Sequence, residues 1–110
     1  MPYYLYKSDR KNKKYVMIMP EFSHSHNFGD NRYRDYTLIS NKNSKYYIDN
    51  QEERDKVKKS YRARHSKDKG LNSPHSASAL SWYILWSAPT LEGGIKNYEK
   101  RFNVKVVNRV

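Results

Sequence analysis

The sequence predicts a single α+β domain over residues 1–110, in which a small antiparallel β-sheet built on an N-terminal hairpin is followed by about three helices. Three observations lead to this prediction. A chain of 110 residues has room for one domain only. Strand-like segments precede helix-like segments along the chain. Aromatic residues form 15% of the sequence, including 11 tyrosines, and they can fill a core that is poor in aliphatic residues.

The N-terminal part of the chain carries the strand signals. Residues 1–14 combine a short aromatic segment with a basic connector, and they form either an N-terminal strand or an arm. The β-prone segment Tyr15–Met19 and the alternating segment Phe22–Phe28 flank a turn signal at Pro20, which predicts a β-hairpin. The next segment, Arg32–Ile39, is either a third strand or an irregular loop.

A basic helix is predicted in the middle of the chain. Asn50, with Glu53 three residues later, fits a capping box, and the helix is expected to run from about Gln51 to Ser66. Two pairs of opposite charge at i,i+4 spacing favour the same helix, namely Glu52–Lys56 and Asp55–Lys59.

The C-terminal part of the chain is the most apolar. The segment Ser76–Trp86 is a nearly all-apolar helix, so we expect it to be the buried centre of the domain, with both of its tryptophans as core anchors. Thr90 caps a last helix over Leu91–Phe102, whose two glycines either weaken it or let a neighbour approach closely. Residues Val104–Val107 form a candidate final strand.

The chain carries a large excess of positive charge. Its 22 Lys and Arg and 11 Asp and Glu give a net charge of +11, and the pI is about 9.8. The absence of cysteine excludes disulfides, cysteine-ligated metal sites and catalytic cysteines. No apolar stretch approaches the roughly 20 residues of a membrane span, and the N-terminal residues lack the apolar core of a signal peptide. We therefore expect a small, soluble protein that is not secreted.

The strongest functional signal is a run of basic residues in and just after the basic helix. Seven Lys and Arg face one acid, Asp68, over fourteen residues. Such side chains neutralise phosphates and release counterions, which is typical of nucleic-acid binding. The alternative is a solvated helix face that only keeps the protein soluble. The candidate nucleic-acid contacts are Lys56, Lys58, Lys59, Arg62, Arg64, Lys67 and Lys69.

Two histidines at i,i+2 spacing, His24 and His26, are candidate metal ligands, with His65 and His75 as further members of a set. Two phenylalanines flank the pair on the same face of the expected strand, which favours histidines packed on a half-buried sheet face. We therefore expect no metal and no cofactor.

A metal-assisted hydrolase is the enzymatic alternative, with His24, His26, Asn27, Asp30 and Asp35 as its candidate cluster. The spacing of these residues matches no nuclease motif. No pair of carboxylates stands at i,i+2 or i,i+4 spacing beside a strand end. We therefore predict that the protein is not an enzyme.

Several short motifs stand in a fixed order between Lys13 and Phe102. They are His26-Asn27-Phe28-Gly29, Tyr33 with Asp35-Tyr36-Thr37, Tyr61 with Arg64-His65, and Trp82-x-x-Leu85-Trp86-x-x-Pro89-Thr90-Leu91 followed by Ile95. In order and spacing, the chain resembles a family of short, basic proteins of unknown function from nucleocytoplasmic large DNA viruses, the giant viruses and their relatives. The resemblance implies a viral protein that is located in the virion or in the infected host cell, in its cytoplasm or nucleus.

These observations together predict a non-enzymatic binding protein. We expect it to bind nucleic acid largely independently of sequence, mainly through phosphates. The alternative is a structural virion component, a minor capsid or internal-layer protein, that uses its basic and aromatic surface to contact acidic virion proteins.

Overall fold

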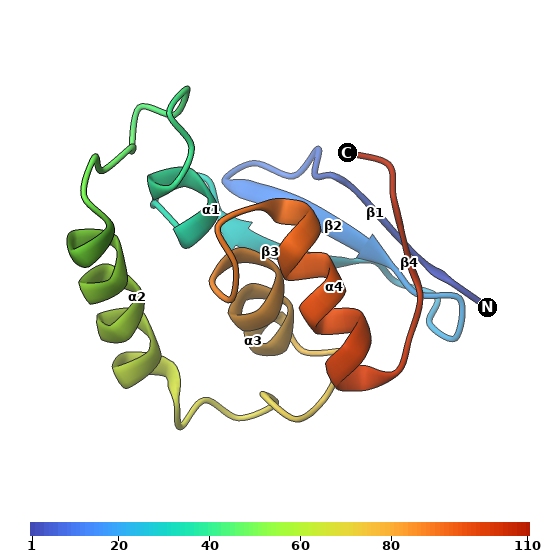
Figure 1. The fold of residues 1–110 in the computed structure, drawn as a ribbon. Coiled ribbons are helices and arrows are strands. Elements are labelled where there is room, and N and C mark those ends of the chain that lie inside the picture. Colours follow the sequence, from blue (N-terminus) through green and yellow to red (C-terminus); the bar gives the residue numbers. More distant parts are fainter.

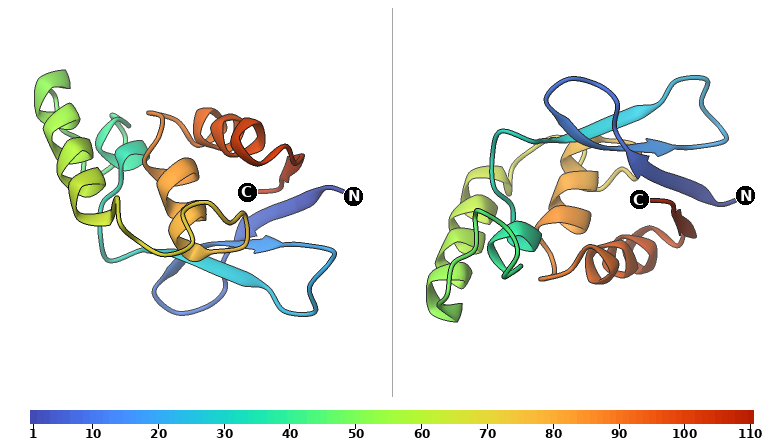
Figure 2. Two further views of the ribbon diagram at one scale, coloured as in Figure 1. Left: turned by 90° about the horizontal axis from the view of Figure 1, so that it is seen from below. Right: turned by 90° about the horizontal axis from the view of Figure 1, so that it is seen from above.

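A four-stranded β-sheet forms one layer of the molecule, and the helices lie on one side of it (Figure 1 and Figure 2). The computed structural model describes all residues, Met1–Val110. The strands are β1 (Tyr3–Lys7), β2 (Lys13–Ile18), β3 (His26–Asp30) and β4 (Val106–Asn108), in the spatial order β3-β2-β1-β4. The predicted α+β class is confirmed, and strands and helices share one hydrophobic core.

The sheet is mixed rather than purely antiparallel, which corrects one part of the prediction. β1 pairs with β2, and β2 with β3, in antiparallel register. β4 instead pairs with β1 in parallel, with Tyr3 opposite Val106. The reason is the crossover through all the helices, which returns the chain to the sheet in the direction in which β1 runs. Residues 1–14 therefore contribute an interior strand and not a free arm.

The second strand of the hairpin is shorter than its sequence pattern predicts. β3 begins at His26, opposite Met17, and residues 19–25 form the connecting loop. The Phe22 ring packs against the ring of His75, with centroids 4.6 Å apart, instead of alternating along a strand. This contact with a distant part of the chain determines the path of the loop.

Residues Arg32–Ile39 include a short helix in place of the strand or irregular loop considered from the sequence. The one-turn helix α1 (Tyr36–Ile39) begins after Asp35, whose carboxylate accepts a hydrogen bond from the Leu38 backbone N–H at 3.1 Å. Aspartate is among the residues that cap helix N-termini best, and here the cap outweighs the strand-like pattern.

The basic helix α2 (Gln51–His65) has nearly the predicted bounds. The Asn50 side chain accepts a hydrogen bond from the Glu53 backbone N–H at 3.1 Å and so caps the helix. Neither of the two predicted i,i+4 ion pairs of this helix is formed. The Asp55 carboxylate instead accepts hydrogen bonds from the Gln51 amide at 2.7 Å and from the Tyr36 hydroxyl at 3.3 Å.

The apolar segment is an α-helix that continues as a π-helix. α3 (Ala77–Leu80) is capped by the Ser76 side chain, and the wider turn η1 (Ser81–Leu85) follows it directly. Trp86, just after η1, is 7% exposed, which confirms it as a core residue. Trp82 is only partly buried at the margin of the core. Sequence spacing predicts an α-helix throughout and does not reveal this local change of winding.

The last helix, α4 (Leu91–Phe102), agrees with the prediction, and the Thr90 hydroxyl caps it by accepting a hydrogen bond from the Gly93 N–H at 3.1 Å. Gly94 faces η1 at very short range, because a Cβ atom placed on it would lie 2.1 Å from the Ile84 carbonyl oxygen. Of the two alternatives considered for the glycines, the close approach of a neighbour is therefore confirmed for Gly94, which lets the backbones of α4 and η1 come together.

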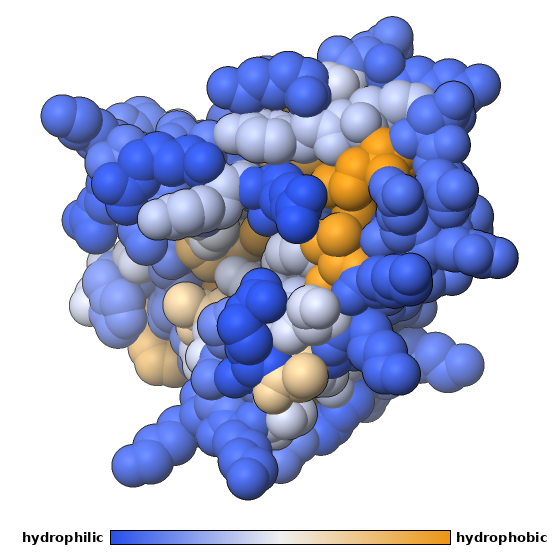
Figure 3. All heavy atoms as spheres, turned by 90° about the vertical axis from the view of Figure 1, so that its left-hand side faces the viewer, coloured by the Kyte–Doolittle hydropathy of each residue, from blue (hydrophilic) through white to orange (hydrophobic).

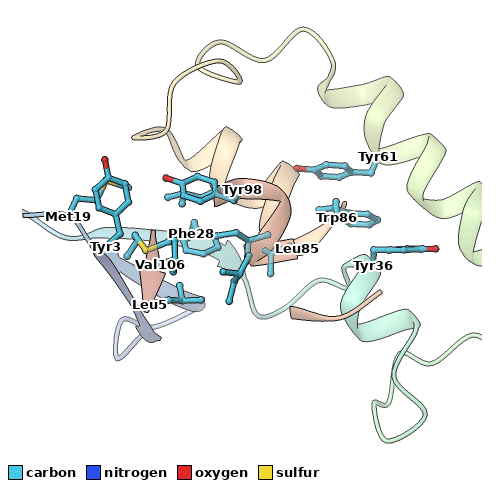
Figure 4. Close-up of a cluster of buried hydrophobic side chains, with 14 of the residues drawn as sticks. Tyr3, Leu5, Met19, Phe28, Tyr36, Tyr61, Leu85, Trp86, Tyr98 and Val106 are labelled. Atoms are coloured by element: carbon cyan, nitrogen blue, oxygen red, sulfur yellow. The ribbon is translucent and has the colours of Figure 1, made fainter. Parts of the chain in front are cut away.

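Aromatic rings make up much of the core, as the composition predicts (Figure 4). Tyr98 and Phe28 are its largest fully buried side chains. The Tyr98 hydroxyl donates a hydrogen bond to the Pro74 carbonyl oxygen at 2.6 Å, so this buried phenol is satisfied. None of the helices combines the length and the apolar composition that crossing a membrane requires.

The contact between α4 and η1 gives a first prediction. Gly94→Ala should lower the free energy of unfolding by about 1–3 kcal/mol through overpacking, although alanine favours helices over glycine by roughly 1 kcal/mol. Urea denaturation measures the change. Lys96→Ala, at an exposed position of the same helix, is the control and should stay within about 0.5 kcal/mol of the parent protein. A Gly94→Ala variant that is as stable as the parent protein would contradict this close approach.

Candidate functional site

A groove of about 740 Å³ separates α2 from the rest of the molecule. One wall is α2, and the other is formed by the start of β2, the end of β3 and the connection from β3 to α1. Residues of α3 and η1 line its floor. Figure 2 shows α2 standing apart at one end of the molecule, next to α1. We refer to this space as the α2 groove.

An aromatic stack holds α2 in this position. Tyr61 is the only buried residue of the helix, and its ring stacks on the Trp86 ring with centroids 4.1 Å apart and an angle of 5° between the planes. In Figure 4, the Tyr36 ring lies on the opposite side of Trp86. Burial raises the pKa of the Tyr61 phenol to about 12, so the stacked ring stays neutral at physiological pH.

Two of the predicted contact residues reinforce this attachment instead of pointing freely into solvent. The Lys58 ammonium donates a hydrogen bond to the Ser87 carbonyl oxygen at 3.1 Å and lies 4.8 Å from the centre of the Tyr36 ring. Burial lowers the pKa of Lys58, the positive charge of Arg62 lowers it further, and Asp55 opposes both effects. The Arg62 guanidinium lies 5.2 Å from the centre of the Trp82 ring, a cation–π contact that anchors it against η1.

Each carboxylate of the α2 groove already has a partner. Asp35 is 1% exposed, and its carboxylate binds the Lys14 ammonium at 2.5 Å and the Thr37 hydroxyl at 2.5 Å. Arg32 binds Asp30 at 2.7 Å and lowers its pKa to about 2. Asp68 contacts the His65 ring nitrogen at 2.7 Å, by a hydrogen bond or ion pair. The acids of the groove therefore leave its other cations unpaired.

Four cations of the α2 groove have no carboxylate within ion-pair distance. Lys13 and Arg34 belong to the wall formed by the sheet and its connection to α1, whereas Lys56 and Arg64 belong to α2. All but Lys13 are exposed, and Lys13 is half-buried. Two walls of unpaired positive charge therefore face each other across a space that an anion can enter.

The seven predicted contact residues fall into separate groups. Lys56 and Arg64 line the α2 groove, Lys58 and Arg62 pack inward, and Lys59 is exposed away from the groove. Lys67 and Lys69, beyond the helix, lie at a shallow depression formed by residues 66–73. Figure 3 shows the α2 side of the molecule, where hydrophilic side chains predominate and a few apolar residues appear between them.

Three further residues of the site were not identified from the sequence. Lys13, Arg34 and Tyr33 line the groove on the side opposite α2, and the Tyr33 side chain is 66% exposed. A signal for them is present in the segment Arg32-Tyr33-Arg34, where one aromatic residue stands between two arginines. The same segment is also typical of a strand, and when it is interpreted as a strand, its combination of basic and aromatic residues does not indicate a binding site.

A second cluster brings together three histidines around Phe22, away from the α2 groove. The ring of Phe22 lies 5.1 Å from that of His26 and 4.6 Å from that of His75, and the His24 and His26 rings are 4.7 Å apart. His65, which the sequence grouped with them, lies instead against Asp68. No group of three or more histidine and acidic side chains is arranged to hold a metal ion, neither here nor at the hydrolase cluster considered from the sequence.

The histidine cluster predicts a loss of stability in acid. Burial lowers the pKa of His26, the nearby His24 and His75 lower it further, and Glu21 and the Met17 backbone oppose this shift. The folded state therefore binds fewer protons than the unfolded state. His26 contributes its full stability above the ordinary histidine pKa of about 6.5, and this stability is lost as the pH falls through the lowered value.

The measurement is the urea midpoint between pH 7.5 and pH 5 for the parent protein and His26→Gln. The variant should show a shallower loss of stability in acid, because it removes the group that must take up a proton on unfolding. His65→Gln, which lies outside the cluster, is the control and should retain the loss. Equal acid slopes for the parent protein and His26→Gln would contradict the prediction.

Comparisons of the chain with protein-family models, with curated proteins and with solved structures found no match.

Proposed function

We propose that the protein is a non-enzymatic nucleic-acid-binding protein that holds a phosphate backbone in the α2 groove with little sequence readout. The observation that carries this proposal is the placement of Lys13 and Arg34 opposite Lys56 and Arg64, all without acidic partners. Contacts of Lys and Arg to phosphates position a nucleic acid without reading its bases.

The electrostatics of the molecule support the same proposal. The net charge of +11 attracts a polyanion at long range, and the groove adds four cations that have no acidic partner. Phosphates that bind the four cations would release condensed counterions, so binding should weaken steeply as salt is added. Lys58 and Arg62 serve mainly to hold α2 in place, and they contribute to binding through the position of the helix.

Charge removal in the groove tests this proposal. The double variant Lys56→Gln/Arg64→Gln should bind nucleic acid more weakly at low salt and should lower the slope of log affinity against log salt by about two units, one for each lost contact. Both side chains are exposed, so the melting temperature should change little. Fluorescence anisotropy over a salt series measures the affinity and the slope.

The matched control removes the same charge elsewhere. Lys96→Gln/Lys100→Gln alters two exposed lysines of α4, which lie outside the groove, and should reduce the slope much less. Equal effects of the two double variants would show that the contacts are spread over the whole surface. Absence of any binding by the parent protein at low ionic strength would refute the proposed function itself.

A second candidate function is a structural role in the virion, as a minor capsid or internal-layer protein, and one observation favours it. The sheet face opposite the helices carries an apolar patch, formed by the register pairs Tyr4–Ile18 and Tyr6–Val16. The Tyr6 and Ile18 side chains are 41% and 39% exposed, respectively. Exposed aromatic and apolar side chains grouped in this way are typical of surfaces that contact another protein.

Purified virus particles distinguish the two functions. A structural component should remain in nuclease-treated particles in a fixed ratio to the major capsid protein, as measured by quantitative mass spectrometry. A nucleic-acid-binding protein without a structural role should be lost, or should vary with the nucleic-acid content of the preparation. Absence from treated particles would exclude the structural role.

A further inference from the structure

We propose that the α2 groove takes single-stranded rather than double-stranded nucleic acid, with a base stacked on Tyr33. This inference rests on the proposed function and names the class of nucleic acid that the same site selects. Three features carry it, namely the size of the groove, the charge on the outer face of α2 and the exposure of Tyr33.

The size of the groove fits a single strand. Its volume of about 740 Å³ lies in the range of pockets that enclose small organic ligands, roughly 300–1,000 Å³. A few nucleotides of one strand fit such a space. A compact space of this volume is about 9 Å across, which is less than the width of the major groove of a duplex alone, about 12 Å, so a whole duplex does not enter it. A duplex would therefore have to dock on the outer surface of α2.

The outer surface of α2 opposes that alternative. Glu52 and Glu53 are exposed in the first turn of the helix, and neither of them forms an ion pair. These two unneutralised carboxylates would lie close to the phosphates of any duplex that received the start of this helix in its major groove. Two unpaired cations of the helix, Lys56 and Arg64, instead line the α2 groove, which is partly open to solvent.

Tyr33 supplies the feature that distinguishes a nucleic acid with unpaired bases from other polyanions. Its side chain is 66% exposed at the groove, and Arg32 lies 5.9 Å from the centre of its ring. The adjacent Arg34 lines the groove, so a base stacked on Tyr33 would have a cation next to it for its phosphate. Aromatic rings beside backbone-binding cations are the usual means of binding single strands, because unpaired bases expose their faces.

The serines that line the groove are compatible with this occupant. The side chains of Ser60, Ser78 and Ser81 line the groove, and their hydroxyls can donate to or accept from a sugar or a base edge. Tyr61 and Trp86 also line it, but they stack on each other, the His65 ring lies 4.4 Å from that of Tyr61, and Tyr36 lies on the other side of Trp86. Tyr33 is therefore the aromatic residue of the groove that offers a free face for stacking.

The experiment compares three fluorescent probes of equal length at low salt: an oligothymidylate, an oligouridylate and a mixed-sequence DNA duplex. The parent protein should bind at least one single strand more tightly than the duplex, and the two single-stranded probes distinguish DNA from RNA. Tyr33→Leu should weaken single-strand binding by about 5- to 150-fold, the effect of losing one base–aromatic stack, and should leave duplex binding unchanged. Tyr6→Leu, an exposed tyrosine on the opposite side of the sheet, is the matched control and should bind as the parent protein does.

The outcomes separate this inference from the function on which it rests. A duplex bound as tightly as both single strands, or equal affinities of Tyr33→Leu and Tyr6→Leu for the single strands, would overturn the inference. If Lys56→Gln/Arg64→Gln still weakened binding in that case, the proposed function would stand. If no probe bound to the parent protein, both would be refuted. Melting curves establish that Tyr33→Leu is folded, and since the side chain is largely exposed, little change is expected.

Discussion

The stacking of Tyr61 on Trp86 is the contact on which the arrangement of the candidate site depends. α2 has no apolar face of ordinary width, and Tyr61 is its only buried residue. A helix attached by one aromatic ring, a lysine hydrogen bond and a cation–π contact stands beside the core instead of lying flat on it. The space left between this helix and the sheet is the α2 groove. Trp86 follows directly on the π-helical turn η1, so the winding of η1 affects the direction of the Trp86 side chain. Through the stack with Tyr61, it also affects the position of α2 and the shape of the groove.

The distribution of charge follows from how the acids are used. The protein has half as many acidic as basic residues, and several of the acids have structural roles. Asp35 both caps α1 and neutralises the partly buried Lys14, an arrangement in which loss of either partner would leave a charge without compensation. Asp30 and Asp68 are likewise paired, so no free carboxylate of the groove cancels the attraction of its remaining cations for phosphate. Folding therefore places four cations without acidic partners on the two sides of one groove.

The sequence predicts well those features that depend on neighbouring residues. The caps at Asn50, Ser76 and Thr90 mark the helix starts correctly, because each cap is a local hydrogen bond. Features that depend on distant contacts were missed. The alternation at Phe22 predicts a strand, but the contact with His75 draws this residue into a loop, and the parallel pairing of β4 depends on the path of the entire chain. The groove also depends on distant contacts, since its walls come from segments that are far apart in the sequence. Among its unpaired cations, only those of α2 belong to a run of basic residues that can be recognised in the sequence.

The parallel pairing of β1 with β4 affects how the chain folds during and after its synthesis. Tyr3 and Val106 meet across nearly the full chain, and closing a loop of about one hundred residues costs on the order of 4 kcal/mol in chain entropy. Such non-local pairing makes folding slow relative to helical domains of similar length. During synthesis, β1, β2 and β3 leave the ribosome early, while one edge of β1 stays open until Val106–Asn108 follow. An open edge is a template for other strands, so the nascent chain stays exposed to aggregation at β1 until β4 has been made and has paired with it.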